Sequence, residues 1–516
     1  MRPTAWLLFA STTVAAPLSG QPAHRHSTAV SAPSSQLGEI DFLNSGKPAA
    51  QPDFIRGVKL LHNFQYEDAV KAFQAAQKAD PDFALAYWGE AMSYNYSLWA
   101  EQYPDDARKA LARLAPTPEA RAAKAETARE KAYLATAEAL YGEGSKFDRD
   151  IAFADRMDVL AKAYPDDINA QAFDALATLG RSHGTRGKAN YEKAGAMLEP
   201  LFKRYPHHPG VAHYLIHSYD DPDHASRALD AARVYDKMAA DSPHAQHMTS
   251  HIFLSLGMWP EVEQANIRTR AAAERNAGKP MPMMACGHGA LWLVYARLQQ
   301  GLPVEKQVAE CRQAAMALIA SGETPAPVVG LPEGAGGSMA DMIVRKGIET
   351  GEWDEAPALP EGKLNFARFI LAYGEVLATG SDPQHAMSAL GYMKSAHEIL
   401  TSNYRKEFPD DDQTMAWADL MVAQGDALAL MVTGRRAEGM AALEAVAKRE
   451  RALPSTFGPP AMLKPTWELL GDERLAVGDR AGAATAYRES LKLQPGRRLS
   501  LAGLAKATSG ASQAAR

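Results

Sequence analysis

The chain has 516 residues, a net charge of −6, 46% hydrophobic residues and 22% charged residues. This composition is typical of a folded globular protein and excludes disorder over most of its length. The slightly acidic balance supplies no basic field for a phosphate backbone, so we do not expect nucleic acid as a partner. Alanine is abundant and runs of β-branched residues are scarce, which favours closely packed helices.

The N-terminus has the pattern of a secretory signal peptide. Arg2 precedes an apolar stretch that ends in small residues near Ala16. A charged start, an apolar core of roughly 12 residues and a small-residue end are typical of an exported precursor. The stretch is too short to span a bilayer comfortably, and we expect no later span. We therefore predict a signal peptide over residues 1–20, a periplasmic or secreted location and no integral membrane anchor.

Helical repeats follow a leader. Residues 21–45, rich in Ser, Ala, Pro and Gln, predict a flexible segment. Two later stretches place small and large apolar residues where a 34-residue helix–turn–helix unit, the tetratricopeptide repeat, interlocks its two helices. The landmarks of the first unit are Pro52, Gly57, Ala69, Phe73, Ala76 and Pro81, and those of the last are Trp467, Leu470, Gly471, Gly478, Ala483, Tyr487 and Pro495. The sequence therefore predicts an all-α, tetratricopeptide-like α-solenoid of antiparallel helix pairs.

One stretch interrupts this periodicity. Residues 321–338, SGETPAPVVGLPEGAGGS, contain several Pro and Gly residues. We interpret them as a linker between an N-terminal solenoid over 46–320 and further helical repeats over 339–516.

Histidines are concentrated in one part of the chain. Eight of the fifteen lie between His207 and His251. Two pairs stand four residues apart, and the second pair follows the first by 34 residues: His213 and His217, then His247 and His251. The prolines ahead of the pairs, Pro209 and Pro243, are also 34 apart. Because residues four apart share a helix face and equivalent helices of neighbouring repeats lie side by side, we expect the four imidazoles to converge in a pocket on the inner face.

This pattern is typical of a transition-metal site, since neutral imidazole is the commonest protein ligand for Zn, Cu, Ni and Fe. Asp221 continues the face of the first pair and offers a carboxylate ligand or a partner for one. Cys286 follows Pro282 at the offset that the first histidine of each pair has from its proline, so a third helix offers Cys286 or His288. The predicted metal ligands are His213, His217, His247, His251, Asp221 and His288. Which divalent metal binds stays open, as does whether Cys286 pairs with Cys311 or both are buried thiols.

Whether the protein is an enzyme also stays open. A metallopeptidase helix carries Glu directly after its first ligand histidine, where this chain has Tyr214 and Met248. A general base would have to come from Asp220, Asp221 or Glu90. Two other interpretations compete with the metal site. The histidines are polar contacts in a groove that holds a protein or peptide partner, which makes the chain an extracytoplasmic scaffold, or they are satisfied structural residues.

Three strings carry a resemblance to a known family: HNFQYEDA at 62–69, AHYLIHSYDDP at 212–222 and PHAQHMTSHIF at 243–253. With them the chain resembles a family of exported bacterial tetratricopeptide-repeat proteins of uncharacterised role. The resemblance implies the repeat fold and export. It implies no activity.

Overall fold

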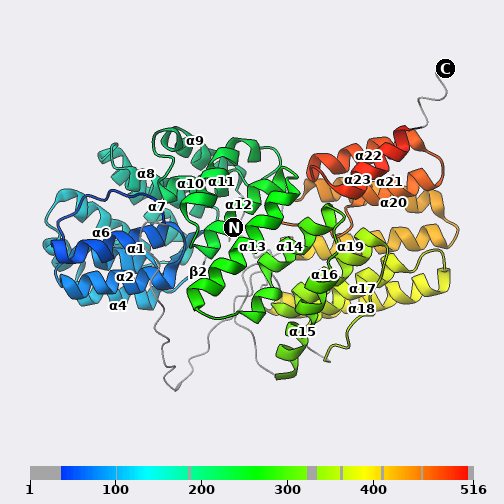
Figure 1. The fold of residues 1–516 in the computed structure, drawn as a ribbon, viewed down its shortest axis with the longest axis horizontal. Coiled ribbons are helices and arrows are strands. Elements are labelled where there is room, and N and C mark those ends of the chain that lie inside the picture. Colours follow the sequence, from blue (N-terminus) through cyan, green and yellow to red (C-terminus); the bar gives the residue numbers. More distant parts are fainter. Residues whose placement is uncertain are drawn as a thin grey trace.

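The computed structural model of the protein describes residues 37–99, 101–183, 187–321, 334–360, 364–407, 412–454 and 457–509. The predicted signal peptide lies outside these residues. Helices make up nearly all the regular structure of the described chain (Figure 1). The helices up to the second histidine pair are α1 (Gln51–His62), α2 (Tyr66–Ala79), α3 (Ala84–Met92), α4 (Pro104–Leu114), α5 (Pro118–Lys124), α6 (Ala128–Leu140), α7 (Lys146–Ala163), α8 (Ile168–Gly180), α9 (Lys188–Arg204), α10 (Pro209–Ser218), α11 (Leu229–Met238) and α12 (Pro243–Ser255).

The helices that follow are α13 (Trp259–Ala277), α14 (His288–Gln299), α15 (Glu305–Ser321), α16 (Ala335–Thr350), α17 (Asn365–Ala378), α18 (Pro383–Glu407), α19 (Asp412–Val432), α20 (Arg436–Ala452), α21 (Thr466–Ala476), α22 (Arg480–Leu493) and α23 (Arg498–Thr508). Short 3₁₀ turns are η2 (Pro48–Ala50), η3 (Ser97–Trp99), η4 (Ala225–Ala228) and η5 (Pro282–Ala285). Two short antiparallel strands, β1 (Asn95–Tyr96) and β2 (Glu101–Gln102), pair Asn95 with Gln102 and Tyr96 with Glu101.

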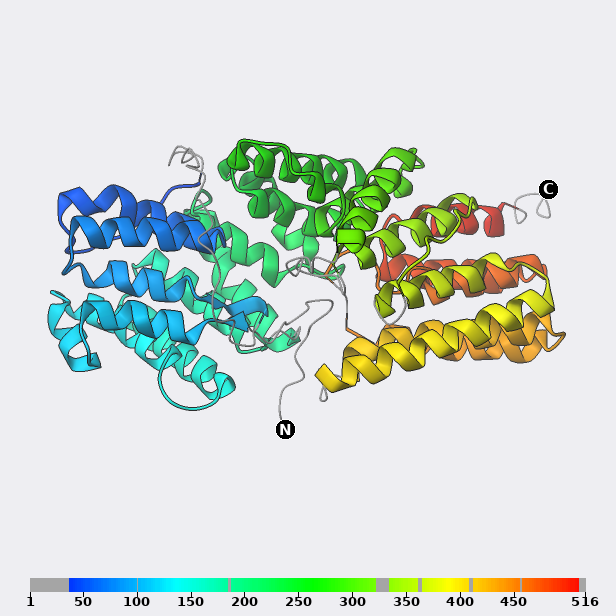
Figure 2. The same cartoon turned by 90° about the horizontal axis from the view of Figure 1, so that it is seen from below.

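The helices form an α-solenoid of antiparallel pairs, which confirms the predicted fold class. Helices that are consecutive in the chain pack on one another through most of its length, and α10 also packs on α8 and α12. The molecule is elongated, with α1–α8 at one end, α17–α23 at the other and α12–α16 between them (Figures 1 and 2). Helix α1 also packs on α10, although the two helices are far apart in the chain. This contact brings the first repeat to the histidine-bearing helices.

The predicted repeat landmarks interlock as expected. A Cβ atom added to Gly57 in α1 would lie 2.8 Å from the ring of Phe73 in α2. A Cβ on Gly471 in α21 would likewise lie 2.7 Å from the ring of Tyr487 in α22. In each pair a glycine therefore makes room for the aromatic ring of its partner helix, and this close approach fixes how the two helices cross.

The predicted flexible leader, residues 21–45, includes residues that are part of the folded solenoid. Leu37 and Phe42 are only 2% and 3% exposed, and the backbone N–H of Glu39 donates to the carbonyl of His207 at 2.9 Å. Residues 37–45 are therefore packed against the solenoid, because their apolar side chains enter its core. Residues 21–36 lie outside the described part of the chain.

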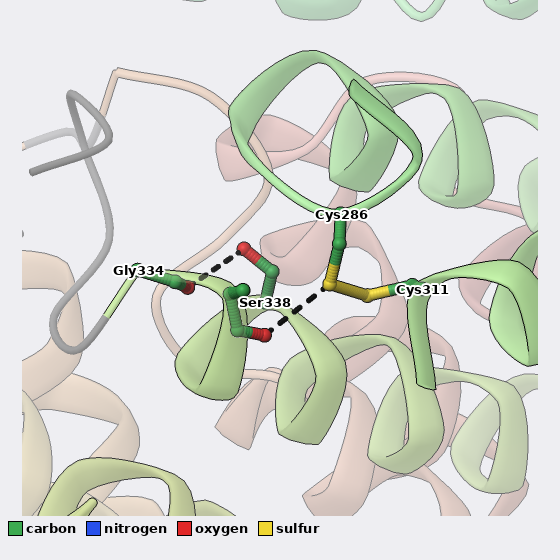
Figure 3. Close-up of a disulfide and its surroundings, with 5 residues drawn as sticks. Cys286, Cys311, Gly334 and Ser338 are labelled. Carbon is green, nitrogen blue, oxygen red and sulfur yellow. Dashed lines mark hydrogen bonds between the residues drawn. A yellow bond between two sulfur atoms is a disulfide. The ribbon is translucent and has the colours of Figure 1, made fainter. Parts of the chain in front are cut away.

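The predicted linker also ends earlier than expected, since α16 begins at Ala335. Residues 322–333 lie outside the described residues. Cys286 and Cys311 form a disulfide, which settles the question left open by the sequence, and the carbonyl oxygen of Ala335 lies 3.3 Å from the Cys286 sulfur (Figure 3). Apolar side chains of α14, α15 and α16 share one core. The segments on the two sides of the predicted linker are therefore packed together.

One segment is long and apolar enough to cross a membrane, Met415–Val432 within α19, and 56% of it is buried inside the protein. The buried side chains of α19 pack in the core formed with α17 and α18. A core helix of a folded protein has the same length and composition as this segment.

Candidate metal centre

The two histidine-bearing helices begin in the same way. The side chain of His208 accepts a hydrogen bond from the Val211 N–H at 3.3 Å at the start of α10, and that of Ser242 accepts from the Ala245 N–H at 3.2 Å at the start of α12. In both helices a proline follows the capping residue. Capping followed by proline fixes the first turn. Each histidine pair therefore lies at the same height in its helix.

The histidines form two groups of three rather than one group of four. The first triad is His213 and His217 from α10 with His244 from the first turn of α12. The Nε2 atom of His213 lies 3.1 Å from that of His217 and 3.2 Å from that of His244. His244 was not among the predicted ligands, although its place in the first turn of α12 could have indicated that it lies near the first pair. A residue there faces the neighbouring helix α10, which already carries the first pair.

The second triad is His247 and His251 from α12 with His288, the first residue of α14. The Nε2 atoms of His247 and His251 lie 3.2 Å apart, and one ligand atom of each of the three residues lies within 4.8 Å of the others. His288 is therefore brought to the site as predicted. Cys286 is not available as a ligand, because its sulfur is in the disulfide and it lies ahead of α14 rather than on it.

The end of α1 orients the first triad. The Nδ1 atom of His213 lies 2.7 Å from the backbone carbonyl oxygen of His62. A carbonyl can only accept, so Nδ1 carries the proton and Nε2 of the neutral ring presents its lone pair to the triad. The ring of His62 itself stacks on Phe173 and binds the Tyr214 hydroxyl at 2.9 Å. His62 is thus a core residue whose main chain holds a site histidine.

In the second triad, His247 and His251 each have a hydrogen-bond acceptor next to the Nδ1 atom. The Nδ1 atom of His247 lies 2.8 Å from Oδ1 of Asn266, whose amide nitrogen donates to the carbonyl of Val262 at 2.9 Å. That second bond fixes the amide with its oxygen toward His247. The Nδ1 atom of His251 lies 2.6 Å from a carboxylate oxygen of Asp220. Both Nδ1 atoms therefore donate, and hydrogen bonding to ligand histidines in this way is typical of metal sites.

This arrangement leaves two unprotonated ring nitrogens facing each other. In the neutral tautomers fixed by Asn266 and Asp220, the Nε2 atoms of His247 and His251 both carry lone pairs, 3.2 Å apart. Two lone pairs repel at this distance unless a cation or proton lies between them. Two imidazole nitrogens, each about 2.0–2.1 Å from one tetrahedral zinc ion, would stand roughly 3.3–3.4 Å apart. The observed spacing fits nitrogens that share an ion.

Burial opposes protonation of His247 and His288. His213 is fully buried, and His217, His247 and His251 are 6–7% exposed. Burial, followed by the neighbouring histidines His288 and His251, holds the pKa of His247 well below 6.5. Burial lowers the pKa of His288 to about 3. The rings of His247 and His288 are therefore neutral at physiological pH, which is the form that binds a metal.

One aromatic ring covers each triad. The ring of Phe64 lies 4.3–5.8 Å from the three imidazoles of the first triad, centroid to centroid, and that of Trp292 lies 4.5–5.4 Å from those of the second. Phe64 has a left-handed backbone with φ of 55°, which a bulky side chain rarely adopts. This strain at the end of α1 aims its ring at the site.

The predicted carboxylates belong to neither triad, although Asp220 contacts His251. Asp221 lies outside both triads and binds the Nδ1 atom of His224 at 2.8 Å. Glu90 accepts from Arg113 and from the side-chain amides of Gln74 and Gln77. Asp220, predicted as a general base, instead orients His251. The reason is local: the chain leaves the α-helix at Ser218, so Asp221 does not continue the helical face that was extrapolated to it.

Acid is expected to destabilise the metal-free protein. Burial, then the neighbouring His208, holds the pKa of His62 well below 6.5, and burial lowers that of His208 to about 3. Because the unfolded chain binds these protons first, stability is fully present above pH 6.5 and is lost as pH falls toward 3, by about 1.4 kcal/mol per pH unit for each such histidine. Denaturant unfolding in a chelator at several pH values measures this. His208→Asn keeps a capping acceptor and should flatten the slope; an unchanged slope contradicts the prediction.

A change at Gly458 is expected to disturb only the second triad. Gly458 has φ of 123°, and a Cβ there would lie 2.6 Å from the Trp292 ring. Gly458→Ala should cost roughly 2–3 kcal/mol from backbone strain and overpacking together, and should displace Trp292 from His251. Gly434→Ala is the matched control, since Gly434 has φ of 91° with open space around it. Tryptophan fluorescence and melting curves that match in both variants would contradict the prediction.

No family model and no curated protein matches this chain. Among solved structures it is similar to the crystal structure of the P58(IPK) TPR domain, with 13% identity over 90% of this chain and 99% of that chain and a TM-score of 0.22. It is also similar to the structure of Naa15/Naa10 bound to HypK-THB, with 14% identity over 90% of this chain and 75% of that chain and a TM-score of 0.24. At these TM-scores neither likeness carries an argument. The class of protein rests on the helices and the site themselves: an all-α repeat solenoid with two histidine triads, each with two buried members and one partly buried member.

Proposed function

We propose that this protein is exported and binds transition-metal ions at its two histidine triads. The donor atoms suit such ions, because imidazole nitrogen is a ligand of Zn, Cu, Ni and Fe, and both groups consist of imidazole alone. Three protein ligands to an ion leave a position free for a further ligand, as in catalytic metal sites. The location rests on the sequence of residues 1–20.

The observation that carries the proposal is the His247–His251 pair. Its two Nε2 atoms face each other at 3.2 Å while each Nδ1 atom donates to an acceptor, Asn266 or Asp220. In the first triad, His217 or His244 can donate a hydrogen bond to His213, so hydrogen bonding alone can account for the close spacing there. In the second triad a neutral pair has no such bond. A bound cation removes the repulsion and explains why the two partners hold the rings in this orientation.

The test is metal content, measured by mass spectrometry on the full chain dialysed against metal-free buffer. We expect stoichiometric transition metal in the wild type and a loss in His247→Ala/His251→Ala, with the helical circular dichroism retained. His385→Ala is the control, because this histidine is half exposed, lies outside both triads and pairs with Glu375. Wild-type protein that stays metal-free after exposure to Zn²⁺ and Cu²⁺ would end the proposal.

The alternative is a scaffold that grips a protein or peptide segment without metal. The burial of His213, His217, His247 and His251 argues against this use of the site, since a peptide cannot reach side chains with 0–7% exposure. Partner binding by this protein would use another surface of the solenoid. A metal-free protein that captures a partner even after the histidines are replaced would favour the scaffold.

A further inference from the structure

The two triads repeat one design along the solenoid. Each takes a pair of histidines four apart from one helix and a third from the N-terminal turn of a following helix, α12 for the first triad and α14 for the second. Each has one aromatic cover, and each is oriented by acceptors of Nδ1 protons. Because the whole arrangement occurs twice, the six histidines form two sites with three nitrogen ligands each, rather than one site with more ligands than it needs.

The two sites are neighbours. The ring centroids of His217 from the first triad and His251 from the second lie 6.4 Å apart, the same separation as that of His251 and His288 within the second triad. His244 and His247 lie less than one turn apart on α12 and serve different triads. Two ions held there would lie side by side, one next to Phe64 and the other next to Trp292.

The donor set favours copper. A buried charge is costly unless an opposite charge offsets it. Imidazole ligands bring no negative charge, and the Asp220 carboxylate binds His251 rather than belonging to either triad. Iron sites of this kind use carboxylate ligands, and copper is the divalent ion that nitrogen ligands bind most tightly. Two cuprous ions also bring half the charge of two zinc ions to the paired triads.

Resting on the proposed metal binding, we infer that the two triads hold a pair of copper ions that binds dioxygen between them. Each cuprous ion gives up one electron. The two electrons reduce dioxygen to a dianion that stays between the two cupric ions, and no proton or outside reductant takes part. The summed charge of ions and ligand is unchanged, so no new net charge is brought between the two triads. Release reverses the step. The aromatic covers and the burial restrict the ligand to a small, uncharged molecule of this kind.

The full chain is loaded anaerobically with a cuprous salt and desalted, and copper is counted before air is admitted. We expect two copper ions per chain. In air, a new near-ultraviolet charge-transfer band should appear and disappear under argon, and the cupric ions should give no electron paramagnetic resonance signal because their spins couple. His244→Ala and His288→Ala should each bind one copper, show the signal of an isolated cupric ion after oxidation and lose the reversible band. His385→Ala should behave as wild type.

The outcomes separate the two proposals. One copper per chain, or two that both give isolated cupric signals after oxidation, overturns the dioxygen inference and leaves metal binding standing. No copper and no other metal overturns both. The wild-type stoichiometry and spectrum decide the matter even if a histidine variant fails to fold.

Discussion

Removing the bound metal is expected to lower the stability of the histidine repeats strongly. An ion that binds only the folded chain stabilises it by about 2.7–4 kcal/mol per site when its free concentration is roughly 100–1,000 times the dissociation constant. The triads join α1, α10, α12 and α14, so both ions act on the same packed unit. A chelator at about pH 7.5 should therefore lower the melting temperature, and added Cu²⁺ or Zn²⁺ should restore it.

The control for this experiment is His213→Ala/His251→Ala, which removes one ligand from each triad. Its melting temperature should be low from the start and should not respond to chelator. A wild-type protein that contains metal yet melts at the same temperature with and without chelator would show that the ions do not hold the repeats together.

The second large effect is expected at Arg497. Its guanidinium group is fully buried, binds both carboxylate oxygens of Glu468 at 2.8 and 2.9 Å and binds a carboxylate oxygen of Glu349 at 2.8 Å. Burial alone would raise the pKa of Glu468, but Arg497 and Lys464 lower it to about 2, so the carboxylate is charged. Arg497→Met leaves two buried acids without their main partner. Removing one member of a buried ion pair costs about 3–5 kcal/mol.

The matched control for Arg497 is Arg436→Met. The Arg436–Glu473 pair, at 3.0 Å, is half exposed on the arginine side, and such pairs contribute about 0–1 kcal/mol. Denaturant unfolding of both variants measures the difference. Because Arg497 also binds the Tyr295 hydroxyl on α14, its loss should loosen the contact between the C-terminal repeats and the helix that carries His288. Equal losses in the two variants would contradict this account.

Much of the fold could be predicted from the sequence because its cause is local. The small–large alternation of Gly57 with Phe73 and of Gly471 with Tyr487 is a property of one repeat, and each repeat packs mainly on its neighbours. The pairing of His213 with His217 and of His247 with His251 followed from helix geometry in the same way. The limits of the leader and of the linker were wrong, because whether Phe42 or Ser338 is buried depends on segments distant in the chain.

The sequence by itself therefore determined the class of fold, the histidine-bearing helices and their common register. Only the tertiary structure decided how the ligands are grouped, because α12 faces two neighbours at once and divides its histidines between them: His244 toward α10, His247 and His251 toward α14. The groups that orient the rings also come from distant parts of the chain. The carbonyl of His62 reaches His213 because α1 packs on α10, a contact across about 150 residues that no local pattern encodes.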